Sequence, residues 1–373
     1  MNYNKSCVSQ RSMPFWCVGN PLADPFGGPI QEKISSVQVA EVLAWAAHKK
    51  YIEATSAHDD DLVPWDMNNL DDDLDPKSET SKTLQKIKAT LDKAGIEFNT
   101  ISCCLHGDKI FRDGGLCNPD PKVRKLVAAK VARTLRIGSF LGARHFTYWV
   151  ARDGFEVPAI TQWNKIYDWL ADGLNFVTSF IEENKLTNYV GATIEPKPNE
   201  PRGQMFLPTS GHAVGFILGR LNNPDFWGVN PELLQHESMC LLNSVMTVSY
   251  LTNLKKLKFL HFGSQIKGQF DNDFPPLIGP EGLKETVMMF AALNQIGWKG
   301  IVEYDCHMLR TDGDPKDVLK ARKQFVADCT KALAISLDLA DRIKPASRAK
   351  SMADADLTSI MQLTGLNSVK LER

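Results

Sequence analysis

The sequence predicts an α/β fold, a closed (β/α)8 barrel of the TIM type with a short C-terminal arm. Three observations lead to this prediction. Short β-rich runs alternate strictly with longer helical patterns, which implies a parallel sheet whose strands are joined by helices. Eight such units occur, and eight units can close into a barrel. The length of 373 residues suits a barrel with insertions, while a doubly wound open sheet is the alternative topology.

The individual elements follow from the spacing of apolar residues along the chain. The predicted strands are Pro14–Val18, Tyr51–Thr55, Phe98–Ser102, His145–Val150, Tyr189–Glu195, Gly228–Asn230, Phe259–Gly263 and Gly300–Asp305. The predicted helices are Val37–His48, Ser81–Ala94, Pro121–Leu141, Thr161–Glu183, Gly211–Leu221, His236–Leu251, Glu281–Ile296 and Pro315–Ile343.

A single barrel domain is predicted over residues 1–344, because no repeat or low-complexity linker divides this part of the chain. Residues 345–373 form a polar tail with a weak apolar pattern, and we expect this arm to contact a second subunit in a homodimer or homotetramer. Hydrophobic residues make up 43% of the chain and the formal net charge is −1, so the core is ample and neither nucleic acid nor a membrane is an expected partner.

The eight cysteines contain no CxxC pair, so free thiols in a reducing compartment are expected rather than disulfides or a cysteine zinc site. No secretory signal is visible, and no apolar run approaches the roughly 18 residues of a membrane span. We therefore expect a cytoplasmic protein.

The segment 191–203, Gly-Ala-Thr-Ile-Glu-Pro-Lys-Pro-Asn-Glu-Pro-Arg-Gly, carries the strongest chemical signal. Glu195 and Lys197 are two residues apart and therefore share one face of a strand. The prolines among them lack the N–H groups of an interior ladder, which places the pair where the chain leaves the sheet. Neither charge is stable when half-buried unless it is paired or bound to a ligand. The alternative is a surface salt bridge on a stiff loop.

Ionisable residues recur after other predicted strands, at the end of a barrel where active sites lie. These residues are His58, Asp61, Glu232, His236, Asp271, Asp273, Asp305 and His307. A single acidic residue at such a position is more often a solvated surface group. Several that converge would repel one another unless a cation lay between them. Carboxylates with an imidazole suit Mg²⁺, Mn²⁺ or Co²⁺.

These motifs together resemble those of the xylose isomerase family. The similar part runs from about Phe15 to the end of the final predicted helix, and its most specific motif is the run 195–203, continued by residues 207–209 and 211–213. Other similar segments are residues 24–27, 58–62, 111–115 and 228–232, together with Trp16, Trp149 and Arg152. The resemblance implies an intramolecular oxidoreductase that interconverts an aldose and a ketose. It would act by ring opening and a metal-assisted 1,2-hydride shift with two divalent cations.

The resemblance also implies a role for each matching residue. The metal ligands would be Glu195, Glu232, His236, Asp271, Asp273 and Asp305, with Glu232 shared between the two cations. His58, oriented by Asp61, would open the sugar ring, and Lys197 would hydrogen-bond the carbonyl oxygen of the substrate. The substrate-binding residues would be Trp16, Trp149, His307 and, from a neighbouring subunit, Phe26.

The chain departs from the family pattern at several pocket positions. Gly263 stands where the seventh strand supplies an aspartate to the first cation, two residues after His261. Four residues separate Glu232 from His236 instead of three, so Gln235 is an extra residue that could point inward. The lost ligand leaves open whether two cations bind or only one binds tightly, and whether His261, His307 or Gln235 replaces it.

Two other functions remain open at this stage. The first is a diverged epimerase or isomerase that acts on a modified sugar in a biosynthetic pathway and uses one metal. The second is a barrel that binds a sugar without catalysis. The second is disfavoured because a binding protein has no need of the acid–base and metal positions that are kept here: His58, Asp61, Lys197, Glu195 and Glu232. Gly263 and the longer Glu232–His236 spacing favour the first over the aldose–ketose isomerase. His106 is a further departure, since it stands where the family has an aromatic residue at the exit of the third strand.

Overall fold

Eight parallel strands form the central sheet of the protein, whose computed structural model describes residues 7–21, 29, 31–67, 74–276, 279–309, 316–343, 349, 350 and 352–355. The strand order is β8-β6-β4-β3-β2-β1-β10-β9. The strands are β1 (Val8–Ser12), β2 (Ala54–His58), β3 (Glu97–Ser102), β4 (His145–Trp149), β6 (Gly191–Glu195), β8 (Trp227–Val229), β9 (Leu260–Phe262) and β10 (Gly300–Tyr304).

The two ends of this sheet meet, so the strands close into a barrel. Parallel bridges join Val229 to Leu257 and Glu232 to His261, between the β8 and β9 segments. The N–H of His261 also donates to the carbonyl of Pro231 at 3.1 Å. The predicted (β/α)8 barrel is therefore confirmed. A separate two-stranded antiparallel ribbon, β5 (Gly154–Phe155) with β7 (Gln204–Met205), lies outside the main sheet.

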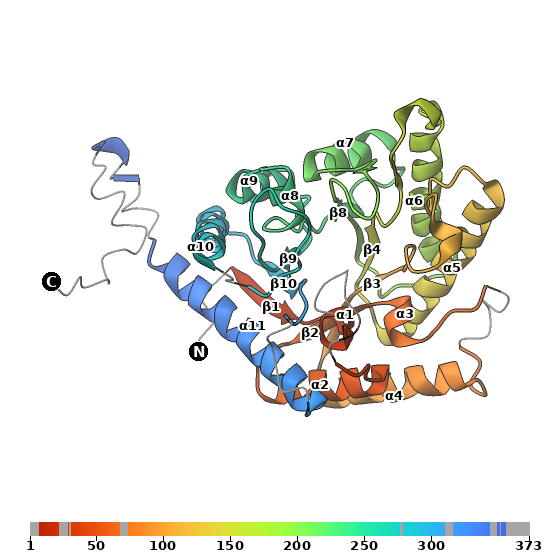
Figure 1. Ribbon diagram of the computed structural model, residues 1–373, viewed down its shortest axis with the longest axis horizontal. Coiled ribbons are helices and arrows are strands. Elements are labelled where there is room, and N and C mark those ends of the chain that lie inside the picture. Colours follow the sequence, from red (N-terminus) through yellow and green to blue (C-terminus); the bar gives the residue numbers. More distant parts are fainter. Residues whose placement is uncertain are drawn as a thin grey trace.

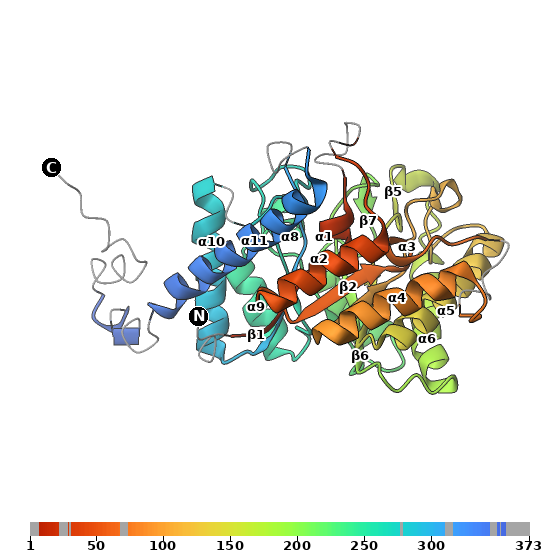
Figure 2. The ribbon, with the colours of Figure 1, turned by 90° about the horizontal axis from the view of Figure 1, so that it is seen from below.

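The long helices surround the strands on the outside of the barrel (Figure 1), and the view turned by 90° shows several of them in front of the strands (Figure 2). They are α2 (Ser36–His48), α4 (Glu79–Ala94), α5 (Pro121–Leu141), α6 (Ile166–Glu183), α7 (Ser210–Arg220), α9 (Ser244–Asn253), α10 (Gly279–Ile296) and α11 (Val318–Asp341). Short helices follow directly after three strands or the loops at their ends: α1 (Phe15–Gly19), α3 (Asp59–Leu62) and α8 (His236–Met239). Two 3₁₀ turns span Lys109–Phe111 and Pro158–Ile160.

Helix α5 shows why the helix boundaries could be predicted. The side chain of Asp120 caps the N-terminus by accepting the N–H of Lys122, and Pro121 occupies the first turn, where its missing N–H costs nothing. The helix ends at Gly142, whose φ of +85° favours glycine. The observed bounds are those predicted from the sequence.

The first strand was predicted in the wrong place. The apolar run after Pro14 forms helix α1, and β1 is instead the polar segment Val8–Ser12. Two of its polar side chains, Arg11 and Ser12, are buried because partners within the protein satisfy them. The Arg11 guanidinium donates to Glu53 at 3.0 Å, and the Ser12 hydroxyl donates to Glu303 inside the barrel at 2.6 Å. A polar strand of this kind has no apolar alternation to reveal it.

The helix predicted over His236–Leu251 is in fact two helices. Helix α8 ends at Met239, and α9 begins after Asn243, whose side chain accepts the N–H groups of Val245 and Met246. Leu241 between them has a φ of +60°, which breaks the helical path. The break separates the short α8, which begins at the candidate site residue His236, from α9 on the outside of the barrel.

Two sequence predictions fall outside the described residues. Phe26 is one, and most of the arm at 345–373 is the other. Among the described helices, none combines the length and hydropathy needed to cross a bilayer. The eight cysteines are all described, and each is a free thiol.

A buried ionic cluster connects α5 to the start of α3. Asp59 is fully buried and lies 2.6 Å from the Lys130 ammonium and 2.9 Å from the Arg133 guanidinium. Its other oxygen accepts the N–H of Cys104 at 2.8 Å. Burial raises the pKa of Asp59, but Lys130 and the hydrogen bonds outweigh burial and lower it. The carboxylate is therefore ionised and anchors the turn that follows β2.

We predict that Lys130→Met destabilises the protein by about 3–5 kcal/mol, because it leaves a buried carboxylate with one cationic partner fewer. The free energy of unfolding from urea denaturation is the measurement. Lys82→Met is the matched control, since the Lys82–Glu79 pair lies on the surface, where solvent screens it, and should contribute little to stability. Equal losses from the two variants would contradict an anchoring role for Lys130.

Candidate active site

A cavity of about 220 Å³ opens at the C-terminal ends of the barrel strands. This volume lies below the roughly 300–1,000 Å³ of pockets for drug-sized ligands, so the cavity suits a small polar molecule. The cavity is lined by Trp16, His58, Thr100, Ser102, His106, Thr147, Trp149, Glu195, Lys197, Glu232, His236, His261, Asp271, Asp273 and Asp305.

The described residues that the sequence singled out converge on this cavity, with two exceptions. Asp61 lies behind His58 and contacts its ring. His307 is not among the lining residues. Its N–H donates to the carbonyl of Asp273 at 3.0 Å, and its Nδ1 lies 3.2 Å from the carbonyl oxygen of Met308. The structure thus gives His307 contacts with the backbone of neighbouring loops.

The positions follow from where each strand ends. His58, Trp149 and Glu195 are the last residues of β2, β4 and β6. Asp305 directly follows β10, and His236 is the first residue of α8. Parallel strands of a barrel present their carboxyl ends at one pole, so residues far apart in sequence meet there.

His58 and Asp61 form an oriented acid–base pair. The Nδ1 atom of His58 lies 3.0 Å from Asp61 Oδ2, which also accepts the N–H of His58 at 2.8 Å. Burial lowers the pKa of His58, but the charge of Asp61 and its hydrogen bond raise it further, so the net shift is upward. Contact through Nδ1 leaves Nε2 for proton transfer. The ring also lies against Trp16, with 4.7 Å between the ring centroids.

Lys197 supplies the one ammonium group among the residues that line the cavity. Its Nζ atom lies 2.6 Å from Asp271 Oδ2 and 5.7 Å from the Trp149 ring. Burial lowers the pKa of Lys197, but Asp271 and Asp273 raise it above its usual value, so the group is a permanent cation. Burial likewise opposes ionisation of Asp271, yet Lys197 and His236 hold its pKa well below the usual range.

Five carboxyl groups line this cavity, against one ammonium group. Burial, with a contribution from the neighbouring Asp305, raises the pKa of Glu232 to about 8 despite the opposing effect of His236. Burial and the charges of Asp271 and Glu232 raise the pKa of Asp273 well above its usual range. Groups shifted in this way need an additional positive charge before they can all ionise, and a bound cation would supply it.

The arrangement of ligand atoms fits divalent cations. Three groups have ligand atoms within 4.8 Å of one another: Glu195–His261–Asp305, Glu195–Glu232–His236 and Glu232–Asp271–Asp273. Within these groups, Glu232 Oε1, Asp271 Oδ1 and His261 Nδ1 are buried without a hydrogen-bond partner. Buried acceptors are rarely left unsatisfied, so these atoms mark where a cation would be held.

His236 is held in the manner of a metal ligand. Its Nδ1 lies 3.1 Å from the carbonyl oxygen of Pro196, which is suited to accept the Nδ1 proton. Its Nε2 then faces Glu232 Oε2 at 2.7 Å and Asp271 Oδ2 at 3.2 Å. Fixing one ring nitrogen so that the other faces the metal is a general feature of histidine ligands. The longer spacing from Glu232 therefore does not remove His236 from the site.

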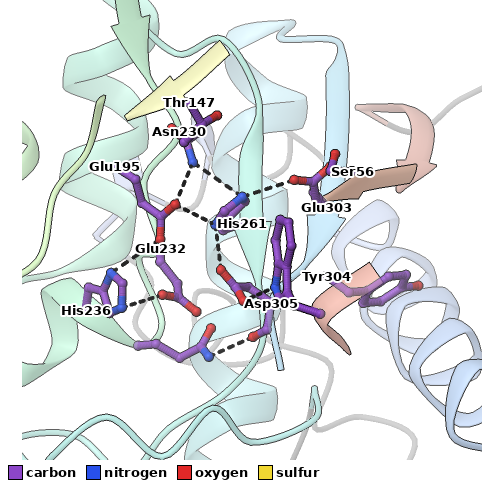
Figure 3. A network of polar contacts seen from close by, with 12 residues as sticks. Ser56, Thr147, Glu195, Asn230, Glu232, His236, His261, Glu303, Tyr304 and Asp305 are labelled. Atoms are coloured by element: carbon purple, nitrogen blue, oxygen red, sulfur yellow. Dashed lines mark hydrogen bonds and ion pairs between the residues drawn. The ribbon is translucent and has the colours of Figure 1, made fainter. Parts of the chain in front are cut away.

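Figure 3 shows a polar network beneath the cavity, in which Asn230 and Glu303 are the residues to which the sequence assigned no role. His261 lies at its centre, between Glu195 and Asp305 on one side and Glu303 on the other (Figure 3). Asn230 donates to Glu195 at 3.2 Å. One available signal was the two-residue spacing of Glu303 and Asp305, which places both on the same face of β10.

The fold and the site define a (β/α)8 barrel whose carboxyl pole carries carboxylates and imidazoles suited to divalent cations. The sequence is 33% identical to the xylose isomerase of Thermus thermophilus over 299 residues, which is 80% of this chain and 73% of the relative. It is 32% identical to the xylose isomerase of Thermus caldophilus over the same shares. The chain therefore belongs to the xylose isomerase family. No family model matches the sequence.

Crystal structures of similar fold come from more distant sequences. A D-psicose 3-epimerase has a TM-score of 0.57 at 16% identity, with 88% of this chain and 98% of that chain covered. A xylose isomerase domain protein from Planctomyces limnophilus has a TM-score of 0.52 at 12% identity, covering 87% and 95%. These similarities support the barrel fold.

We predict that Asp61→Asn lowers the titration midpoint of His58, measured by NMR of the imidazole protons. The His58 pKa lies above its usual value of about 6.5 in the folded protein. The pair therefore stabilises the fold fully below about pH 6.5, and that stabilisation is lost as the pH rises through the folded pKa.

Asp60→Asn is the matched control for this prediction, because Asp60 pairs with Lys130 at 2.9 Å rather than with His58. If the His58 midpoint moved equally in both variants, general charge rather than the Asp61 contact would set it.

Proposed function

We propose that the protein is a divalent-metal-dependent sugar isomerase that interconverts an aldose and a ketose by a 1,2-hydride shift. The observation that carries this proposal is the joint presence, around one small cavity, of three overlapping groups of possible cation ligands, an oriented histidine and a buried ammonium. Membership of the xylose isomerase family supports it independently. The cavity is of a size for a monosaccharide rather than a polymer.

Ring opening is the first task that the residues can perform. A cyclic sugar opens when the proton of its anomeric hydroxyl moves to the ring oxygen. His58 is placed to move this proton through Nε2, because Asp61 holds Nδ1 and orients the ring. The neighbouring Asp61 charge also stabilises the protonated imidazole. A positioned imidazole contributes about 10²–10⁴-fold to such proton transfers.

Lys197 provides a charged hydrogen-bond donor for a substrate oxygen. Its ammonium is nearly fully buried and held by Asp271, so its position is fixed before substrate arrives. Negative charge that develops on a carbonyl oxygen during transfer would be stabilised by this preorganised cation. Divalent cations held by the carboxylate groups supply further polarisation of substrate oxygens.

Aromatic walls exclude water from the reacting carbons. Trp16 is fixed by a hydrogen bond from its Nε1 to Asp305 Oδ1 at 2.8 Å, and Trp149 lines the same cavity, in contact with His106. A dry pocket favours direct transfer of hydrogen between adjacent carbons, since no water is present to exchange a proton. This is the property that distinguishes a hydride shift from enediol chemistry.

We predict that the protein converts at least one member of a panel of aldoses and ketoses, modified sugars included, when Mg²⁺, Mn²⁺ or Co²⁺ is present. In deuterated water the product should carry hydrogen at the carbon that receives it, as read by NMR. Removing the metals with a chelator should stop the reaction. No conversion of any sugar under these conditions would contradict the proposed function.

A companion prediction concerns Lys197. Lys197→Met should lower kcat by about 10²–10³-fold, the usual loss for a preorganised donor of this kind. Lys93→Met, which removes an exposed lysine of α4, is the control and should leave kcat unchanged. A parallel fall in both variants would point to a general effect of charge on the protein.

Epimerisation is a second candidate function, and His106 is the observation that favours it. His106 lines the cavity at the position where the resemblance to the family implies an aromatic residue. The centroid of its ring lies 5.9 Å from that of His58. Burial and the charge of His58 lower the pKa of His106 to about 3, so it is a neutral donor and acceptor beside the substrate. An epimerase that works through an enediolate would incorporate deuterium from the solvent, which the same experiment detects.

A further inference from the structure

The seventh strand cannot supply a ligand from position 263. A Cβ atom built on Gly263 would lie 2.5 Å from the carbonyl oxygen of Asp305 and 2.5 Å from Gln235 Oε1. Real Cβ atoms do not approach backbone this closely, so any side chain at 263 would force the β9 and β10 segments apart. The close approach of the Asp305 backbone therefore excludes a carboxylate side chain at position 263, so replacing the glycine alone would not restore that ligand.

The extra residue between Glu232 and His236 occupies the space in front of Gly263. The Gln235 amide lies against this glycine and donates to the carbonyl of Asp305 at 2.8 Å and to Asp273 at 3.3 Å. These bonds tie the loops after β8, β9 and β10 together. The glycine and the inserted glutamine therefore form a matched pair, and a neutral amide stands where a negative charge would otherwise be.

His261 lies two residues before Gly263 and so points to the same side of β9. Its ring is buried, with 3% of its surface exposed. Its Nδ1 lies 2.7 Å from Asp305 Oδ2 and 3.5 Å from Glu195 Oε2, yet it makes no hydrogen bond of good geometry. A ring nitrogen that faces two carboxylates in this way is placed where it could share a cation with them.

Glu303 determines which nitrogen of His261 carries the proton. Its Oε1 lies 3.2 Å from His261 Nε2. Its Oε2 accepts hydrogen bonds from the hydroxyls of Ser12 and Ser56 and from the amide of Asn99 (Figure 3 shows Ser56). A carboxylate with three donors on one oxygen stays an acceptor, so Glu303 favours the tautomer with the ring proton at Nε2 and the lone pair at Nδ1. The amide nitrogen of Asn230 also lies 3.3 Å from Nε2 and is tied to Glu195 as well. His236 is oriented by Pro196 in the same manner.

We propose that the first cation of this protein is bound by Glu195, Asp305 and the Nδ1 atom of His261, with Glu303 as the positioning residue behind the imidazole. In the family pattern the ligand of the seventh strand stands at the position of Gly263, whereas here it would be His261, two residues earlier in the strand and deeper in the barrel. The ligand atom would then be a neutral nitrogen instead of a carboxylate oxygen. Such a site prefers Mn²⁺, Co²⁺ or Zn²⁺ over Mg²⁺, because imidazole suits those metals and Mg²⁺ favours oxygen ligands. This inference rests on the proposed metal-dependent function.

The first test measures metal affinity on metal-free protein by calorimetry, with Co²⁺ and Mg²⁺ as separate probes. His261→Gln should lower the ratio of Co²⁺ to Mg²⁺ affinity at one site by about 10-fold or more. Glu303→Gln should weaken Co²⁺ binding by about 10–100-fold, since it removes the partner that orients the imidazole. His212→Gln is the control, because that imidazole is exposed on α7. Unchanged Co²⁺ affinity in His261→Gln would overturn the assignment.

The second test separates a ligand from a merely structural residue. Pulsed electron paramagnetic resonance of bound Mn²⁺ detects a directly coordinated imidazole through its nitrogen coupling. His236 and His261 are the histidines grouped with the carboxylates, and all eight histidines of the chain are described. In the His236→Gln protein, a nitrogen coupling should remain, and it should vanish in the His236→Gln/His261→Gln protein. Its absence already in the single variant would contradict a His261 ligand.

The two proposals fail separately in these experiments. If the nitrogen coupling and the affinity changes appear but no sugar is converted, the metal assignment stands and the isomerase function falls. If sugar is converted while His261→Gln binds Co²⁺ as the parent protein does, only the metal assignment falls. Circular dichroism of each variant in the presence of chelator confirms that the comparison is between folded proteins.

Discussion

The carboxyl groups that gather at the C-terminal end of the barrel are the constraint on which the rest of the structure depends. Five lining residues are carboxylates, Lys197 is the one lining ammonium group, and the imidazoles of His236 and His261 lie close to the carboxylate oxygens. Burying such charges is costly unless they are paired or bound to a cation. The raised pKa values of Glu232 and Asp273 express that cost directly. A divalent cation is the simplest species that relieves it while keeping the carboxylates ionised.

Polar side chains in the interior of the barrel lie beneath the site at its C-terminal end. Barrel interiors are usually filled by branched apolar side chains. Here a hydroxyl ladder of Thr100, Thr147 and Thr193, with spacings of 2.8 and 2.9 Å, lies beside the fully buried Glu303 and its donors. These groups satisfy one another, so they carry little penalty and hold His261 in one orientation. The polar sequence of β1 has the same explanation, because Ser12 faces this layer.

The sequence predicted the barrel, the bounds of α5 and the convergence of Glu195, Lys197 and Glu232, because those features depend on local signals and on the closure of a parallel sheet. It could not place β1, whose polar residues become buried only through distant partners such as Glu53 and Glu303. The sequence marked Gln235 as a residue that could point inward, but it left the role of this residue open. Its contact with Gly263 joins two loops that are neighbours only in the closed barrel, and nothing in either segment alone reveals it.

The central claim is that cations bind where these carboxylates and imidazoles meet. Anomalous X-ray diffraction from a crystal soaked with Mn²⁺ tests it most directly, because the signal locates the metal itself. The account predicts one peak within bonding distance of Glu195, His261 and Asp305, and a second beside Glu232, His236 and Asp271. A crystal with full Mn²⁺ exposure and no peak at this pole, or a first peak bonded to carboxylates alone with His261 turned away, would contradict it.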